Sequence, residues 1–116
     1  MDFSQDLVKG SIVPIILSLL RDRAMYGYEI VKVVNARTNG VFEWREGTLY
    51  PTLHRLEHEG FIRAYWQEAA SGLNAGRKRK YYAVTRKGLA ELTRRAQEWQ
   101  AFSSAVSAIV LSDGGR

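Results

Sequence analysis

The sequence predicts a mostly helical fold with one small β-hairpin and a long last helix. Three observations lead to this expectation. Apolar residues recur at helical spacing in four segments, at about 4–21, 26–38, 46–59 and 86–111. Aromatic residues alternate with other residues between the third and fourth segments, as they do in strands. The last segment is long for a chain of 116 residues, a length that otherwise suits one domain without internal repeats.

The first helical segment, 4–21, contains a proline. Leu7 and Ile12 are among the apolar residues that repeat there at helical spacing. Pro14 interrupts the pattern, and a proline inside a helix removes a hydrogen bond and crowds the preceding turn, at ~3 kcal/mol or more. We therefore expect either a kink at Pro14 or a helix that properly starts near Val13.

The next two helical segments carry their own stop signals. In 26–38, Tyr28 and Val31 form an apolar stripe with one of the valines that follow, and the Asn-Gly pair after the segment should end the helix. The segment 46–59 precedes Gly60, which can adopt the left-handed conformation of a helix C-cap.

A β-hairpin should follow the third helix. Its strands are expected at 61–67 and 80–84, and the loop 71–76 between them holds two glycines and an asparagine. One side of the first strand carries Ile62, Ala64 and Trp66. Thr85 can then cap the last helix, and the tail 112–116 should fray.

The charge balance favours a polyanionic partner. The net charge is +5 and the isoelectric point about 9.7, and lysine and arginine bind nucleic acid by neutralising phosphates and releasing counterions. Cysteine is absent, which excludes disulfides and thiolate metal sites. No apolar run is long enough to span a bilayer, and acidic residues precede the apolar 12–20, so we expect a cytoplasmic protein without a signal peptide.

The segment 46–60 carries the strongest functional signal. On a helical wheel, Leu49, Leu53 and Leu56 form one inward stripe. A basic hairpin follows this helix, and that order is typical of a winged helix-turn-helix that reads DNA. The N-terminal residues of such a helix face the base edges. The groove-facing candidates are therefore Thr48, Tyr50, Pro51, His54 and Arg55.

Each candidate has a chemistry suited to DNA. Arg55 can donate to guanine or to a phosphate, Thr48 and Tyr50 can bond phosphate, and Pro51 can meet a thymine methyl. Pro51 is tolerable if the helix starts near Thr48, because first-turn N–H groups lack an intrahelical acceptor. The alternative is an ordinary amphipathic surface helix.

Four cations lie together at the expected hairpin tip. Such a run suits a phosphate or minor-groove contact, and the alternative is a solvated basic loop. Two more cations follow at the start of the last helix. The six residues are Arg77, Lys78, Arg79, Lys80, Arg86 and Lys87.

Catalytic and metal signals are weak. His54 and His58 stand one helical turn apart, but Arg55 occupies the place where a zinc protease needs glutamate, and no third ligand is fixed. The serines near 103–107 have no base beside them. The sequence therefore predicts no enzyme, no metal and no cofactor.

The last helix has two interleaved seven-residue tracks, which approximate a coiled-coil seam and predict a homodimer. Trp99 lies in this seam between Ala96 and Ser103, where a large ring beside small residues leaves room. In a dimer, two Trp99 rings could wall an apolar cavity for a flat ligand; the alternative is that Trp99 simply fills the interface. We expect 1–85 to form a winged helix-turn-helix DNA-binding domain, and 86–116 a dimerisation helix with a frayed tail, in one structural unit.

Five motifs in order resemble the PadR family of bacterial transcriptional regulators. They are YGYEI at 26–30, EGTLYPTLHRLE at 46–57, EGFI at 59–62, GRKRKYY at 76–82 and VTRKG at 84–88. The single helix after the wing resembles the short subfamily. The resemblance implies a homodimer, usually a repressor, in which Tyr28 packs in the core and Tyr26 can reach a DNA phosphate.

The resemblance also implies a ligand site. Some members of the short subfamily bind planar aromatic drugs between paired tryptophans at the dimer centre, and Trp99 occupies the matching position. The positions near it are Leu7, Gly10, Pro14, Ala96 and Ser103. Pro14, within the first helical segment, departs from the expected pattern of those members.

Two functions are compatible with these observations. The first is a homodimeric repressor that binds an inverted-repeat operator in double-stranded DNA, with half-sites ~34 Å apart, and is released by a small hydrophobic or aromatic effector. The second is a winged-helix module that binds a ligand or a protein and does not read DNA.

Overall fold

The computed structural model describes residues 4–42, 44–68 and 76–113. The fold is mostly helical with a small antiparallel sheet and a long last helix, as the sequence predicts. Its elements, in chain order, are α1 Gln5–Lys9, α2 Ile12–Asp22, β1 Met25–Tyr26, α3 Gly27–Arg37, α4 Glu46–His58, β2 Ile62–Glu68, β3 Lys78–Val84 and α5 Arg86–Val110.

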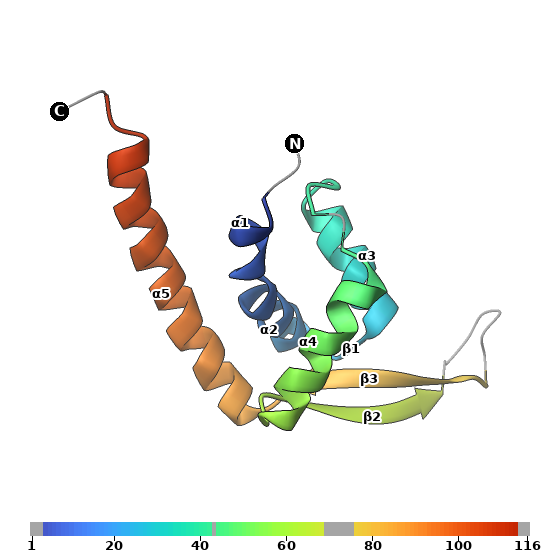
Figure 1. Ribbon diagram of the computed structural model, residues 1–116. Helices are drawn as coiled ribbons and strands as arrows, with labels where there is room; N and C mark the ends of the chain where they lie inside the picture. Colours follow the sequence, from blue (N-terminus) through green and yellow to red (C-terminus); the bar gives the residue numbers. More distant parts are fainter. Residues whose placement is uncertain (1–3, 43, 69–75, 114–116) are drawn as a thin grey trace.

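The molecule is elongated because two elements project from a small helical centre. The helices α2, α3 and α4 gather on one side of the sheet, and the hairpin β2–β3 extends away from them. The last helix, α5, rises on the same side as these helices, from the end of the sheet opposite the hairpin tip (Figure 1). The principal extents are 62 × 31 × 21 Å. The hairpin and the last helix therefore extend into solvent beyond the compact helical centre.

The buried core joins the helices to the helix-facing side of the sheet. The leucine stripe predicted for the third helix is confirmed, since Leu49, Leu53 and Leu56 of α4 are at most 1% exposed. Burying one such side chain stabilises the fold by about 1.5–3 kcal/mol. The other fully buried large side chains are Ile16, Leu17, Ile30, Ile62 and Tyr82.

The N-terminal segment forms two helices where one was expected. The helix is interrupted at Gly10 and Ser11, upstream of Pro14. Pro14 therefore falls in the first turn of α2. A first-turn residue needs no intrahelical acceptor for its N–H, so proline fits there without a kink. The expected alternative of a helix starting near Val13 is close, because α2 starts at Ile12.

A short strand opens the second helical segment. β1 pairs with β3 through Met25–Tyr82 and Tyr26–Tyr81, which gives the sheet order β1-β3-β2. The expectation that Tyr28 packs in the core is wrong, since its side chain is 53% exposed. The buried stripe of α3 is Ile30, Val31 and Val34.

The ends of α4 differ in how well they were predicted. Gly60 has φ +82°, the expected left-handed C-cap, and Phe61 N donates to Leu56 O at 3.0 Å to close the turn. At the other end, α4 begins at Glu46 and not near Thr48, so Pro51 lies inside the helix. Its missing N–H would have bonded Gly47, an exposed residue that water can reach.

The end of α4 is joined directly to the start of α5. Thr85 Oγ1 donates to the Gly60 carbonyl at 2.6 Å, and Lys87 Nζ donates to the Glu59 carbonyl at 2.8 Å. Thr85 Oγ1 also accepts from Gly88 N at 3.0 Å, which makes it the predicted cap of α5. Carbonyls left open at the end of one helix are thus satisfied by the residues that begin the next.

Candidate nucleic-acid interface

The outer face of α4 is polar and exposed over its whole length. It lies opposite the leucine stripe, because residues one turn apart share a face of a helix. Every groove-facing candidate from the sequence is on the solvent side: Thr48, Tyr50, Pro51, His54 and Arg55. The structure therefore leaves this face free for a partner.

Tyr50 is the least free of these residues. A Cβ placed on Gly27 would lie 2.6 Å from the Tyr50 hydroxyl oxygen, so the phenol packs against the first residue of α3. Burial raises the pKa of Tyr50, and the Glu46 carboxylate raises it further. Tyr50 therefore remains a neutral phenol that packs α4 against α3 while 37% of the residue stays exposed.

An ion pair links α4 to the hairpin. Lys80 Nζ lies 3.9 Å from Glu57 Oε1, and the same ammonium stands 5.8 Å from the ring centre of Tyr82. Burial raises the pKa of Tyr82, with smaller contributions from Tyr50 and Glu57. Lys80 therefore lies beside α4, while buried Ile62 and Tyr82 hold the hairpin against the helices.

The predicted basic tip is mainly a basic strand. The return strand was expected from Lys80, but β3 begins at Lys78 because Glu68 and Gln67 of β2 extend the pairing. Only Arg77 and Gly76, with φ +88°, precede it in the described part of the turn. The rest of the expected loop, 71–75, lies outside the described residues. Since side chains alternate along a strand, the cations fall on two faces.

The face of the sheet turned away from the helices carries an aromatic ladder. Tyr81 stacks on Tyr65 with ring centres 5.9 Å apart and meets Tyr26 edge-on at 5.6 Å. Arg79 lies 4.4 Å above Tyr26, and Arg63 lies 5.2 Å above Tyr65. Tyr26 and Arg79, both DNA-contact candidates, therefore contact each other within this ladder.

The sequence did not identify this ladder as a unit. The signal was present in the alternation of 63 with 65 and of 79 with 81. Tyr26 joins the ladder through β1, a strand of two residues that local patterns do not reveal.

The residues expected to bind a ligand meet only in part. A groove of about 640 Å³ runs between the middle of α5, from Leu92 to Trp99, and α1, α2 and α3. Leu7, Pro14, Ala96 and Trp99 are among the residues that line it. Gly10 and Ser103 are not among its lining residues. Phe42 and Leu19 also line it and were not predicted.

The distal half of α5, from Trp99 onwards, is largely exposed in the described chain. Trp99 is 52% exposed, and Ile109 is 78% exposed. The other large apolar side chains exposed here are Phe102, Val106, Val110 and Leu111, the C-cap residue that follows the helix. An apolar face of this length, on a helix of 25 residues, is typical of a protein–protein interface.

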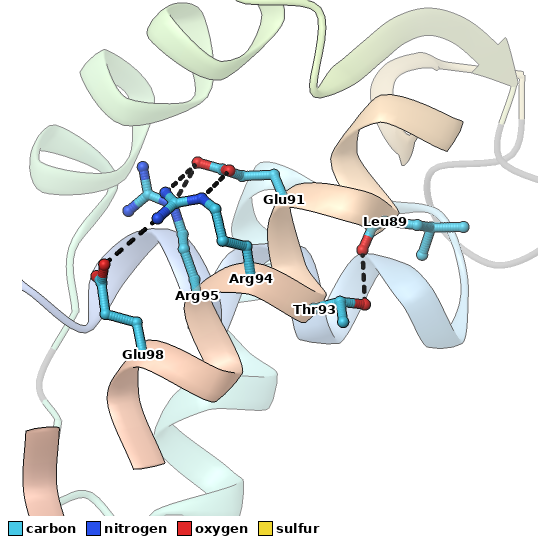
Figure 2. Close-up of polar contacts among 6 residues, drawn as sticks. All are labelled: Leu89, Glu91, Thr93, Arg94, Arg95 and Glu98. Carbon is cyan, nitrogen blue, oxygen red and sulfur yellow. Dashed lines mark hydrogen bonds and ion pairs between the residues drawn. The ribbon is translucent and has the colours of Figure 1, made fainter. Parts of the chain in front are cut away.

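The proximal half of α5 is braced by ion pairs. Glu91 accepts from Arg94 Nε at 2.9 Å and from Arg95 Nε at 2.8 Å, and Glu98 adds a contact to Arg94 at 3.3 Å (Figure 2). The hydrogen bonds from Arg94 and then Arg95 lower the pKa of Glu91 to about 2. The carboxylate is therefore ionised throughout the neutral range.

Two other properties bear on function. Among the described residues, no three histidine, aspartate or glutamate side chains gather as a metal site would require, and His54 and His58 have no third ligand beside them. No helix in the described ranges combines the length and apolar character needed to cross a membrane.

Comparison with known proteins agrees with this architecture. The model of the transcriptional regulator PadR-like family matches residues 16–94. An uncharacterized protein of Lysinibacillus sphaericus is 39% identical over 94 residues, which cover 81% of this chain and 83% of the relative.

Solved structures are similar over nearly the whole chain. A transcriptional regulator from Clostridium thermocellum is 32% identical with a TM-score of 0.82, over 93% of this chain and 98% of the other. A PadR-like transcriptional regulator from Bacillus cereus is 31% identical with a TM-score of 0.78, over 93% and 99%. With its winged helix-turn-helix and long last helix, the chain belongs to the PadR-like family of DNA-binding transcriptional regulators.

Proposed function

We propose that the protein is a homodimeric repressor that binds an inverted-repeat operator. The observation that carries this proposal is the ion pair from Lys80 to Glu57, which holds a basic strand beside the exposed polar face of α4. Two-fold symmetry would give one α4 and one hairpin per half-site, with half-sites ~34 Å apart.

In this proposal, α4 and the hairpin of one copy together form a reading head, which contacts one half-site. The residues of each reading head have distinct roles. Thr48, His54 and Arg55 face the major groove, with Pro51 against a thymine methyl and the hydroxyl of Tyr50 near a phosphate. On the hairpin, Arg77 and Lys78 contact phosphates. Lys80, Arg79 and Tyr26 chiefly position the strand, because each already has a partner within the chain.

Dimerisation is supported by the surface of α5. In this proposal, residues 1–85 form the reading head, and 86–116 supply the arm. The apolar face of the distal half would pack on the second copy and cover part of its groove, burying Phe102 and Ile109. Each copy would present the same surface to the other, as two-fold symmetry requires.

The groove supports a ligand-responsive regulator. Its lining is mainly apolar and includes an exposed indole, Trp99, which suits a flat hydrophobic or aromatic effector. A ligand that binds better to one dimer arrangement than to the other would change the spacing of the two reading heads and release the operator.

The test is DNA binding as a function of salt. Fluorescence anisotropy would measure Kd for duplexes from the upstream region of the protein's own gene. Replacing Arg77 and Lys78 with glutamine should weaken binding to all duplexes and reduce the salt slope by about 1 for each lost phosphate contact. Arg94→Gln is the matched control, because Arg94 lies on α5 and is already paired with two glutamates.

Two outcomes would refute parts of the proposal. An unchanged salt slope in the Arg77 and Lys78 variants would remove the hairpin from the DNA interface. A wild-type dimer that binds no duplex at low salt would favour a winged-helix module that takes a ligand or a protein.

A further inference from the structure

Trp66 is the most exposed large aromatic side chain of the sheet. The register pairs Trp66 with Lys80, and further in, Ala64 with Tyr82. Cross-strand partners share a face, and Tyr82 is buried under the helices. Trp66 therefore stands on the helix-facing side of the sheet, but the hairpin has already passed the edge of the core at this position, and the side chain is 66% exposed.

No other aromatic ring of the described sheet lacks a contact with another ring or with a cation. Within the described part of the chain, the tyrosines of β1, β2 and β3 each contact a ring or a cation, whereas no such contact is found for Trp66. An indole carries a large apolar surface, and leaving it in water forgoes the stabilisation that burial would give. This position favours a partner outside the chain.

The surroundings of Trp66 specify the chemistry of that partner. Lys80 lies directly opposite on β3, and its ion pair with Glu57 shows that this face of the hairpin is the one turned towards α4. Exposed Lys78 and Arg77 follow towards the turn, and Glu68 is the one acid paired along this face. A flat apolar ring flanked by cations suits a polyanion with apolar sugars and bases between its charges, which is the surface of a DNA groove.

We infer that Trp66 is a DNA-contacting residue of the hairpin. Its indole packs against deoxyribose or a base edge of the operator while Lys78 and Arg77 hold the adjacent phosphates. The inference rests on the proposed function. It adds an uncharged, apolar contact to a hairpin that would otherwise bind DNA through its cations alone. A contact of this kind contributes affinity without releasing a counterion.

The experiment compares the salt dependence of two classes of variant. Trp66→Ala should raise Kd for the operator about tenfold, in the range that base stacking contributes, and should leave the salt slope unchanged. The Arg77 and Lys78 variants should lower the slope. Trp66→Phe should recover part of the affinity, since a smaller ring keeps part of the contact.

Fluorescence gives an independent readout. The emission of wild type minus that of Trp66→Phe isolates Trp66 from buried Trp44 and from Trp99. Adding operator should change this difference spectrum and reduce its quenching by acrylamide. Thermal melting should be nearly the same for all three proteins, because the side chain is mostly exposed.

Three results would overturn the inference. Wild-type affinity in Trp66→Ala would exclude the DNA contact while leaving the repressor proposal intact. Loss of affinity together with a changed sedimentation coefficient would assign Trp66 to a contact between copies. Failure of the wild-type protein to bind any duplex would refute both proposals.

Discussion

The two halves of α5 form one continuous helix but meet very different surroundings. The proximal half is held by the cap at Thr85, the buried Leu92 and the ion pairs of Glu91. The distal half exposes Phe102 and Ile109 and makes no comparable contact in the described chain. The contrast teaches that a helix can be regular over its whole length while the chain buries only one half of it.

The largest effect on this comparison is expected from a substitution at Gly88, where the start of α5 packs closely against the end of β3 and the turn that follows α4. A Cβ there would overlap the Phe61 carbonyl oxygen and lie 2.7 Å from Val84 Cγ2. Gly88→Val should destabilise the fold by more than about 3 kcal/mol, because backbone must shift to admit it. Urea denaturation followed by circular dichroism measures the effect.

The matched control is Gly47→Ala on α4. A Cβ on Gly47 would meet nothing within 4 Å, so alanine should be neutral or stabilise the helix by about 0.5–1 kcal/mol. If Gly88→Val unfolds at the same urea concentration as the wild type, the close packing at Gly88 does not limit the stability of the fold.

The distal half can be tested through association. Val106→Glu places a charge on the exposed apolar face and should raise the dimer dissociation constant at least about 100-fold, because an unpaired charge would be buried. Sedimentation at micromolar concentration measures the change, while far-ultraviolet circular dichroism should stay unchanged. Gln100→Glu tests whether charge alone is enough; a dimer unaffected by Val106→Glu would disprove the interface.

A smaller loss is expected from the cap of α5. Thr85→Ala removes the acceptor for Gly88 N and the donor to the Gly60 carbonyl and should cost about 1–2 kcal/mol of folding free energy. Thr85→Ser keeps the hydroxyl and should retain most of the stability. Equal losses in both variants would show that the hydroxyl is not the cause.

The smallest effect concerns pH. Glu91 has a pKa of about 2 in the folded chain, below its ordinary value of 4.5, so the unfolded state takes up a proton more readily. Its stabilisation is present above pH 4.5 and is lost as the pH falls towards 2, a change on the order of 1 kcal/mol after solvent screening. Urea midpoints at pH 6 and 3 should therefore differ less in Glu91→Gln than in wild type. Glu98→Gln is the control, since Glu98 is 70% exposed, and it should follow the wild type.

Local sequence patterns predicted the parts of the fold that depend on neighbouring residues. The leucine stripe of α4 and the left-handed Gly60 were identified because helical spacing and glycine chemistry act within one or two turns. The order of helices, hairpin and long last helix followed from the same signals.

The errors lie where a distant segment decides the outcome. β1 exists through its pairing with Tyr82 and Tyr81, and the cations at 78–80 join a strand because β2 pairs with them. Tyr28 fits an apolar stripe by spacing, yet no element covers it in the described structure, and Lys32 stands 5.6 Å from its ring centre. A local pattern does not show which of several similar faces its partner will cover.

The same limit applies to the candidate site. Spacing identified the exposed residues of α4 correctly as a face, but it could not show that Tyr50 is packed against Gly27 or that Lys80 is paired with Glu57. It also grouped Trp66 with the inward residues of its strand, because alternation does not tell where a strand leaves the core.

The hydrogen bonds from the start of α5 to the carbonyls at the end of α4 bear on how chimeric regulators should be assembled. In such a chimera, the DNA-binding part of one regulator is joined to the last helix of another. A junction at 85/86 would keep Thr85 but remove Lys87 from the Glu59 carbonyl and Gly88 from beneath Phe61. The DNA-binding part would then lose two contacts that hold the end of α4 against the start of α5. Crossing over beyond Trp99 retains the ion pairs of Glu91 and the indole that lines the groove, and it exchanges the exposed apolar surface that follows. DNA-binding parts and last helices from different regulators are therefore best interchanged there.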